Sequence, residues 1–404
     1  MLLIGINQLQ PGLRVRLAVV NPTAPERTLL KPGAVLTEPV ITSLGKHGVR
    51  QVWVEHTLTS DLDEAGYLDL LSAKQAVHAL LKTDLPRLAN HPLTGDRVLE
   101  YRRAVHELVR RLEAARPFAG VADPLFDAQA MLATHCANTA YLAALIALEL
   151  ELYVVRERPT LSARRAGNIV NLALGAMLHD IGKVRLDAAS AMRHEATEPV
   201  EPAAATPYAD HPDLGDDMLT AAEVPATVRH IVRCHHHRDD GTGWPDQAED
   251  LRGLGDEPAG RRPHVFTRIV SAANVLDTLM FDADGVPRPV VAALGDFASP
   301  RFDGWFDPVV RRAVLRHLPP FAIGSQVELS DGRNAVVVRP NSRQPCRPTV
   351  RLLDETDAVS GRPIALDLVE HRQVCITSCV GAPVRRRLFE LPEPRRAEPP
   401  SEAA

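Results

Sequence analysis

The chain of 404 residues begins with short apolar runs that glycine and proline interrupt. Apolar runs of this length between turn residues are typical of strands, and helical spacing that stops at Gly48 is typical of a short helix. We predict strands at residues 2–6, 13–20 and 51–54 and a helix at residues 41–47. Residues 1–60 are therefore expected to form a small mixed α/β module.

From residue 61 the apolar positions recur with the spacing of helices. Residues 61–120 are rich in charge, and Leu99, Ala104, Leu108 and Leu112 are available for one apolar face. We interpret this segment as connecting helices that lead to the core.

Residues 121–320 are predicted to form a helical core. Ala128–Leu150 is almost continuously apolar, as expected of a helix that is buried on all sides, and Asn171–Leu178 repeats this pattern. Further helices are expected at residues 213–219 and 226–236. Residues 185–211 contain much Ala, Pro and Glu, a composition that favours a mobile loop over a packed element.

Beyond residue 321 the pattern changes to the alternation of strands. We predict strands at residues 325–329, 334–338, 349–353 and 373–376, with Asp331-Gly332 as the turn of the first hairpin. Residues 321–384 are expected to form a small β module that serves as an adaptor. Residues 385–404 are rich in Arg, Pro and Glu and are predicted to be a disordered tail.

Composition adds little to this picture. A net charge of −5 gives no case for general attraction to nucleic acid or to a membrane surface. No uninterrupted apolar run reaches the roughly 20 residues of a membrane span, and no charged region precedes the first apolar residues. Five cysteines, an odd number, favour a reducing compartment, and we expect a cytoplasmic protein. Cys375 and Cys379 lack a second ligand pair and are predicted to pack.

The most informative motif is LHDIGK at residues 178–183. His179 and Asp180 are adjacent, so on a helix their side chains diverge by about 100°. A metal at the rim of the helix can still contact both, and Lys183 falls on their face, where an ammonium can hold a phosphate oxygen. Alone, this pair would more ordinarily be a buried His-Asp contact at a helix end.

Other histidines change that balance. His135 lies inside the first apolar helix, His211 precedes a proline, and residues 235–245 read HHHRDDGTGWP. Together these motifs resemble the HD-GYP family, a branch of the HD-superfamily metal-dependent phosphohydrolases whose members typically hydrolyse cyclic di-GMP. The family signature has Glu where His237 stands and Tyr where Trp244 stands. The resemblance implies a mainly α fold, in which an all-helical HD-type core lies between the two small modules.

The resemblance also implies a site for two divalent transition metals, and imidazole and carboxylate donors suit iron, manganese or zinc. His135 and His179 would serve the first metal, Asp180 would bridge, and His211, His235 and His236 would complete the second. Adjacent ligands such as His235 and His236 can converge only where a helix ends, and we expect Gly241–Gly243 to end it. His230 and His237 are expected to be supporting or surface groups.

One ligand departs from the family pattern. The family places an aspartate first in an Ala-Asp-x-Phe-Asp-Ala-Leu run, and residues 273–279 here read ANVLDTL. Asn274 therefore replaces the carboxylate, while Asp277 fits the later aspartate. An amide oxygen carries no charge and is a weaker ligand, so we expect weak occupancy of the first metal and slow or absent catalysis. A register shift that brings Asp277 to the metal is disfavoured by its three-residue offset.

The segment that follows departs from the pattern as well. The family usually has a basic Arg-Pro-Tyr-Arg-like segment there, but Arg288 is the only cation in residues 280–289. Met131 stands where some members carry a glutamate for a third metal, so a trinuclear site is not expected. Two functions follow. One is hydrolysis of cyclic di-GMP to pGpG or GMP, weakened by Asn274; the alternative is a degenerate HD-GYP protein that signals by binding a nucleotide or a protein partner. A hydrolase for another nucleotide is a weaker third option.

The expected roles are specific. Asp180 and Lys183 are the expected catalytic residues, with Lys183 stabilising charge on the phosphate. The expected substrate-binding residues are Lys183, Arg238, Gly243, Trp244 and Pro245, although Trp244 fits a packing role as well as a stacking role. No membrane span and no nucleic-acid partner are expected, and an oligomer is left open.

Overall fold

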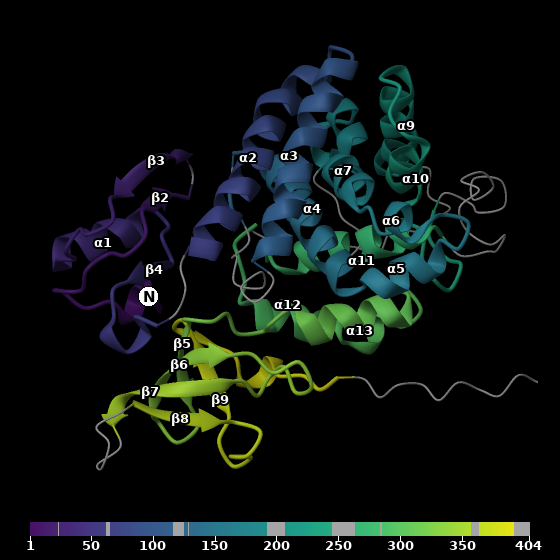
Figure 1. Cartoon of the computed structure of the whole chain (residues 1–404). Helices are drawn as coiled ribbons and strands as arrows, with labels where there is room; N and C mark the ends of the chain where they lie inside the picture. The colour runs from purple at the N-terminus through teal and green to yellow at the C-terminus, as the bar shows by residue number, and fades with distance from the viewer. Residues whose placement is uncertain are drawn as a thin grey trace, which may run out of the picture.

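A helical core lies beside two smaller modules in the computed structural model (Figure 1). The structure describes residues 1–22, 24–61, 65–115, 125–127, 129–191, 207–244, 263–282, 285–356 and 363–391. The predicted fold class is confirmed: the core is all-helical, the N-terminal module mixes strands with one helix, and the C-terminal module is a β-sheet.

The core is organised around one apolar helix, α4. Its helices are α2 (Ala65–Leu88), α3 (Gly95–Ala114), α4 (Met131–Glu149), α5 (Glu151–Glu157), α6 (Ala163–Ala166), α7 (Val170–Leu178), α8 (Ala188–Ala191), α9 (His211–Ala221), α10 (Ala226–Cys234), α11 (Val265–Leu279), α12 (Val290–Phe297) and α13 (Pro308–His317). Helices α2, α7 and α11 pack against α4, which explains why α4 is apolar on every face. Among the described helices, α4 alone has the length and hydropathy of a membrane span, and 83% of that window is buried within the fold.

Helices α2 and α3 belong to this core rather than only leading to it. Their buried residues share one hydrophobic cluster with those of α4 and α7. Of the face predicted for α3, Leu108 and Leu112 are buried, but Leu99 is 52% exposed and that assignment was wrong. The buried positions are Val98, Tyr101, Val105, Leu108, Val109 and Leu112. Leu99 lies one residue, about 100°, away from this stripe.

The N-terminal module contains two separate strand pairs. Its elements are β1 (Leu2–Gly5), β2 (Val19–Asn21), β3 (Ala24–Leu30), α1 (Glu38–Lys46) and β4 (Gln51–Val54), with β1 paired to β4 and β2 to β3. The predicted strand at 13–20 was wrong over most of its length. Val15 accepts and donates backbone hydrogen bonds with residues 33–34, while Arg16 donates to Trp53, so this segment changes partner and forms no ladder.

The C-terminal module is one antiparallel sheet in the order β10-β9-β5-β6-β7-β8. Its strands are β5 (Gln326–Leu329), β6 (Asn334–Arg339), β7 (Thr349–Thr356), β8 (Pro363–Asp367), β9 (Ile376–Cys379) and β10 (Ala382–Pro383). The predicted hairpin at Asp331-Gly332 is present, and Gly332 has a φ of +87°. The strand predicted at 373–376 begins only at Ile376, and β8 and β10, each of which contains a proline, were missed.

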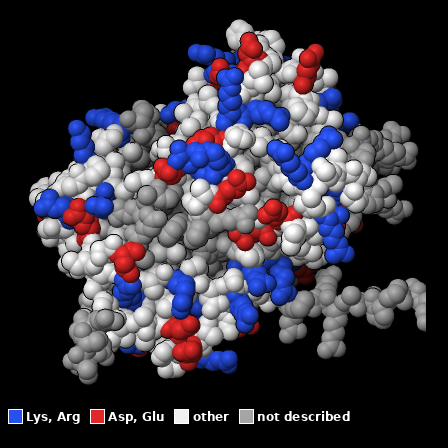
Figure 2. Space-filling model, in the orientation of Figure 1, with Lys and Arg blue, Asp and Glu red and all other residues white. Residues whose placement is uncertain are grey.

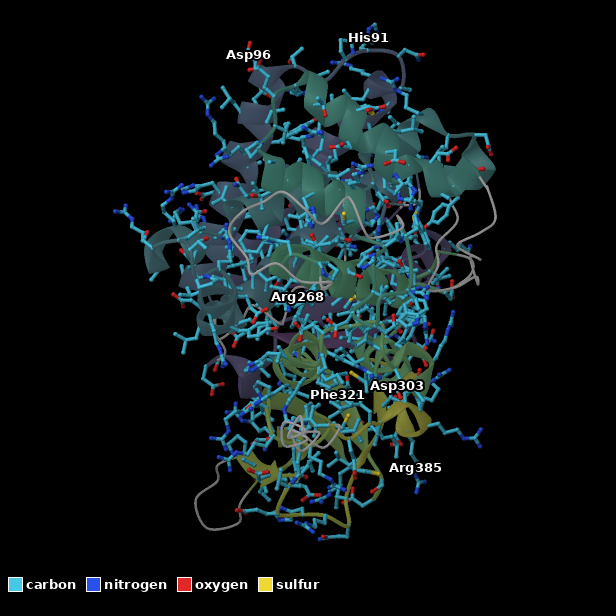
Figure 3. The ribbon with its side chains drawn as sticks, turned by 90° about the vertical axis from the view of Figure 1, so that its right-hand side faces the viewer. His91, Asp96, Arg268, Asp303, Phe321 and Arg385 are labelled. Atoms are coloured by element: carbon cyan, nitrogen blue, oxygen red, sulfur yellow. The ribbon has the colours of Figure 1, made fainter. Side chains whose placement is uncertain are left out.

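The predicted tail is ordered in its first part. Arg385–Arg387 form a 3-10 turn, and Phe389 packs against both the core and the β module. Residues 392–404 and most of the predicted mobile loop, residues 192–206, lie outside the described part of the chain. Figure 3 shows Phe321 and Arg385 toward the β module, and His91 and Asp96 at the far end of the α2–α3 pair.

The first and last modules contact each other directly. The Leu3 N–H donates to the Gly324 carbonyl at 2.8 Å, and Leu3 forms a parallel bridge with Ser325. Arg351 holds Asp61 with two hydrogen bonds of 2.8 Å. On the face drawn in Figure 2, basic and acidic side chains are interspersed.

Candidate metal centre

The predicted histidine and aspartate ligands come from four separate parts of the core. His135 lies in α4, and His179 and Asp180 follow the last residue of α7. His211 opens α9, and His235 and His236 follow the end of α10. Every ligand except His135 therefore lies at a helix end, where the backbone changes direction and neighbouring side chains can reach one point.

Asp180 occupies the middle of the cluster and is fully buried. Its Oδ1 lies 3.2 Å from His211 Nε2 and 3.5 Å from His235 Nε2. Its Oδ2 lies 3.4 Å from His179 Nε2 and 3.6 Å from His135 Nε2. Each oxygen thus faces a different set of imidazoles, which is the arrangement of a carboxylate that bridges two cations.

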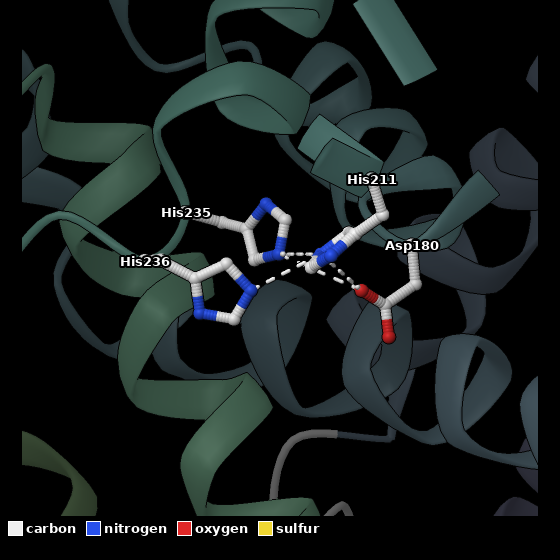
Figure 4. Close-up of side chains that lie close together, drawn as sticks. All are labelled: Asp180, His211, His235 and His236. Carbon is white, nitrogen blue, oxygen red and sulfur yellow. Dashed lines mark hydrogen bonds and ion pairs between the residues drawn. The ribbon is translucent and has the colours of Figure 1, made fainter. Parts of the chain in front are cut away.

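One set of imidazoles, here called the closed half, consists of His211, His235 and His236 (Figure 4). His211 Nε2 lies 3.3 Å from His235 Nε2 and 3.1 Å from His236 Nε2, and all three side chains are buried. With Asp180 they provide four donor atoms within 4.8 Å of one another. Three nitrogens and one carboxylate oxygen fit a divalent transition metal.

Backbone carbonyls fix the orientation of three imidazoles, those of His211 and His235 in the closed half and that of His179. His211 Nδ1 lies 2.6 Å from the Tyr208 carbonyl, His235 Nδ1 lies 2.8 Å from the Val232 carbonyl, and His179 repeats the contact with Ala176 at 2.9 Å. A carbonyl can only accept, so each Nδ1 carries the proton and each Nε2 directs its lone pair into the cluster. Lone pairs at such short separations repel one another, and a shared cation removes that repulsion.

The other set, here called the open half, consists of His135, His179 and Asn274. His135 Nε2 lies 3.2 Å from His179 Nε2 and 2.9 Å from Asn274 Oδ1. Asn274 therefore faces the cluster at the position predicted for the missing carboxylate. The side chain of His135 is 15% exposed, whereas those of His179, His211 and His235 are 0% exposed.

Asp277 lies behind the open half. Its Oδ2 is 2.7 Å from His135 Nδ1, on the side of the ring away from the cluster. The carboxylate accepts a hydrogen bond from the Nδ1–H of His135, which leaves the lone pair of Nε2 for a metal. Asp277 therefore orients a ligand, and the geometry gives no support to the alternative in which it replaces Asn274.

Burial sets the protonation states. It lowers the pKa of His179 and His236 well below the usual value and lowers the pKa of His211 to about 4. Burial alone would raise the pKa of Asp180, but the neighbouring imidazoles and the Lys183 ammonium lower it by more, so that pKa lies well below its usual range. Neutral imidazoles around an ionised carboxylate are the states that metal binding requires.

Lys183 and Gly182 complete the HDIGK motif. Lys183 is buried, with Nζ 2.7 Å from Asp180 Oδ2 and 5.2 Å from the centre of the Tyr208 ring. A Cβ on Gly182 would lie 1.9 Å from the carbonyl oxygen of His211. Only glycine permits this close approach, which brings the first motif against the start of α9.

The residues predicted to bind substrate separate into two groups. Trp244 stacks on His236, with ring centres 4.2 Å apart, and a Cβ on Gly243 would lie 2.2 Å from the His236 carbonyl oxygen. Both residues therefore support the candidate ligand His236 by packing against it. For Trp244 this is the packing role that the sequence left open. The Arg238 guanidinium stacks on Trp305 at 3.5 Å. Pro245 lies outside the described residues.

One expectation about the histidine run needs correction. Helix α10 ends at Cys234, before the paired histidines, so Gly241–Gly243 do not end it. His237 is buried beside the cluster but belongs to neither ligand set in the described residues, as predicted. Tyr208, which contacts His211, His236 and Trp244, was missed because it lies within the predicted loop.

Comparison with known proteins finds a family match over the segment that contains the cluster. Residues 132–279 match the HD domain family, and residues 326–382 match a family described as a KOW domain associated with HD domain. The chain is 29% identical over 225 residues to the cyclic di-GMP phosphodiesterase PA4108 of Pseudomonas aeruginosa, which covers 54% of this chain and 47% of that protein. The chain thus spans about half the length of the curated relative that it matches. It is also similar to the solved structure of Bd1817, described as an HDG"Y"P protein from Bdellovibrio bacteriovorus, with 15% identity, a TM-score of 0.41 and coverage of 78% of this chain and 97% of that one.

Proposed function

We propose that this chain, whose residues 132–279 form an HD domain of the HD-GYP type, is a metal-dependent phosphodiesterase that cleaves cyclic di-GMP. The observation that carries the proposal is the position of Asp180, whose two oxygens face separate sets of imidazole nitrogens. A carboxylate shared by two cations is typical of enzymes that attack phosphate esters in line.

The chemistry divides between the cations and the chain. Two divalent cations, iron, manganese or zinc, would polarise the phosphate and lower the pKa of water toward neutrality. The chain keeps the imidazoles neutral by burial and orients their Nε2 atoms through backbone carbonyls. Lys183 brings a buried positive charge to Asp180, where it can stabilise charge that develops on a phosphate oxygen.

Two features support low activity. Asn274 gives the open half an uncharged ligand, so that half is proposed to hold its cation more weakly than the closed half. Arg288, the one cation in residues 280–289, donates to the Leu279 carbonyl at 3.0 Å and to Asp296 at 2.6 Å. Its guanidinium is therefore engaged within the fold and contributes less to holding the phosphates.

The same two features favour a second candidate. A chain that binds one cation tightly, and a nucleotide without cleaving it, would act as a signalling module. The two candidates differ in a single measurable property, which is turnover of the bound nucleotide to pGpG or GMP.

The experiment is metal analysis of the purified full chain combined with a turnover assay on cyclic di-GMP after loading with Mn²⁺ or Fe²⁺. We expect between one and two metals per chain and slow formation of pGpG or GMP. Two metals per chain with no product at any loading would reject the enzyme and retain the signalling candidate. Asp213→Asn serves as a control, because it changes a carboxylate that lies two residues after His211 and whose side chain is 66% exposed. This variant should leave metal content and turnover unchanged.

A further inference from the structure

The metal centre is accessible on one side. Among its imidazoles in the described chain, only His135 has an appreciably exposed side chain. A substrate phosphate therefore approaches from the side of the open half. Side chains near His135 on α4 and near Asn274 on α11 should therefore contact the rest of that substrate.

Two partly exposed aromatic rings lie on this side. Phe281 follows the end of α11, two helical turns beyond Asn274, and its ring centre is 6.2 Å from that of Phe126 with 30° between the ring planes. Met131 lies one turn before His135 on α4, with its Cε against Gly285. From the helical rise, Met131 is about 6 Å and Phe281 about 10 Å along the helices from the open half.

Phe126 is held between two anchored residues. Asn138, which is buried, accepts from the Leu125 N–H at 2.9 Å and donates to the Leu125 carbonyl at 3.2 Å. The Asp127 carboxylate, also buried, accepts from Lys82 at 2.8 Å and from the Gln129 N–H at 3.1 Å. Burying an amide and a carboxylate is costly unless both are bonded, so this short segment is firmly fixed while the ring between the anchors stays partly exposed.

Phe281 is anchored as well. Its N–H donates to the Thr278 carbonyl at 3.2 Å, it forms an isolated bridge with Pro287, and its side chain packs on the helical core. Two fixed, adjacent and partly exposed rings beside a polar site are suited to contact a flat ligand group. Arg288, the cation of residues 280–289, is engaged by Asp296. This side of the site therefore presents aromatic rings to the substrate rather than the Arg288 guanidinium.

We propose that Phe126 and Phe281 form a platform on which a purine base of the substrate stacks while its phosphate reaches the cations. The choice of a nucleotide rests on the proposed function, whereas the platform itself rests on the two rings and their anchors. A ribose separates base from phosphate, which fits a platform whose Phe281 lies about two helical turns from Asn274. Recognition then depends on the face of the base, which compensates for the missing basic segment.

The test compares two ligands that differ only in the base. Binding of GMP and of ribose 5-phosphate to the full, Mn²⁺-loaded chain is measured by calorimetry. Stacking of one base on an aromatic ring is expected to make GMP bind about tenfold more tightly than ribose 5-phosphate. Phe126→Ala and Phe281→Ala should each remove most of this difference and leave ribose 5-phosphate binding unchanged.

Controls separate the ring from general effects. Phe126→Trp should keep the difference, and Leu152→Ala, at a leucine on α5 that is 86% exposed, should leave both affinities unchanged. Metal content and melting temperature report on folding, and Phe126→Ala carries the test alone if Phe281→Ala does not fold. Equal binding of the two ligands by the unmodified chain, or a difference that survives both alanine variants, would overturn the platform. A difference that depends on the rings, without turnover of cyclic di-GMP, would sustain the platform and reject the proposed enzyme.

Discussion

The closed and open halves of the metal centre share Asp180 but differ in what surrounds it. The closed half has three buried imidazoles, two of them oriented by backbone carbonyls. The open half has two imidazoles and the amide of Asn274, and His135 is partly exposed. The comparison shows that one carboxylate can lie between a half whose imidazoles are all buried and a half with one partly exposed imidazole and an uncharged amide. We therefore expect the two cations to differ in affinity.

Removing the shared ligand should abolish this difference, with the largest effect of any single change. Asp180→Asn withdraws the charged donor from both halves and leaves Lys183 buried without its carboxylate. We expect loss of both metals, a loss of activity of at least about a thousandfold, and a decrease in stability of about 3 kcal/mol. Metal content, turnover and thermal unfolding measure the three effects. Retention of one tightly bound metal would show that the closed half does not depend on the bridge.

Acid should act on the closed half of the metal-free chain. Burial lowers the pKa of His211 to about 4, whereas an unfolded chain has a value near 6.5. Above pH 6.5 the residue is neutral in both states and contributes no pH dependence. As pH falls from 6.5 to 4, only the unfolded chain gains the proton, so stability decreases, by about 3 kcal/mol for this one group. His179 and His236 shift in the same direction and add to the loss.

Chemical denaturation of the metal-free protein between pH 7 and pH 4 measures this slope. His211→Gln should flatten it, because the titrating group is gone. A slope that His211→Gln leaves unchanged would show that the closed half does not control acid stability.

Restoring the carboxylate should bring the halves closer together. Asn274→Asp gives the open half a charged oxygen at a position already 2.9 Å from His135 Nε2. We expect metal affinity of that half to rise by the order of a hundredfold and turnover to rise with it. Titration with Mn²⁺ and the cyclic di-GMP assay provide the measurements. The matched variant Asn274→Ala should change little if the amide is a poor ligand, and equal metal content in all three proteins would contradict our account of the asymmetry.

The sequence predicted which side chains cluster better than it predicted what supports them. His135, His179, Asp180, His211, His235 and His236 could be assigned because each stands in a motif whose order the family pattern fixes. The contact of Asp277 with the far nitrogen of His135 depends on how α11 lies against α4, which residue order does not encode.

The same limit applies to the modules. The link between Arg351 and Asp61 joins residues 290 apart in sequence, and neither segment carries a local pattern that indicates the other. The helical periods and the hairpin turn were predictable because they depend on neighbours. Leu99 and the strand at 13–20 were not, because tertiary packing decided which residues were buried and which strands paired.

The smallest expected effect comes from the support of the open half. Asp277→Asn keeps the size of the side chain but removes the charge that fixes the proton on His135 Nδ1. Loss of such a partner typically lowers metal affinity by about tenfold or more, here only in the open half, because the closed half is oriented by carbonyls instead. Stepwise metal titration resolves the two halves, and the tighter step should stay unchanged. If Asp277→Asn weakens both steps equally, the halves are coupled through Asp180, and the asymmetry belongs to Asn274 alone rather than to two separately supported sites.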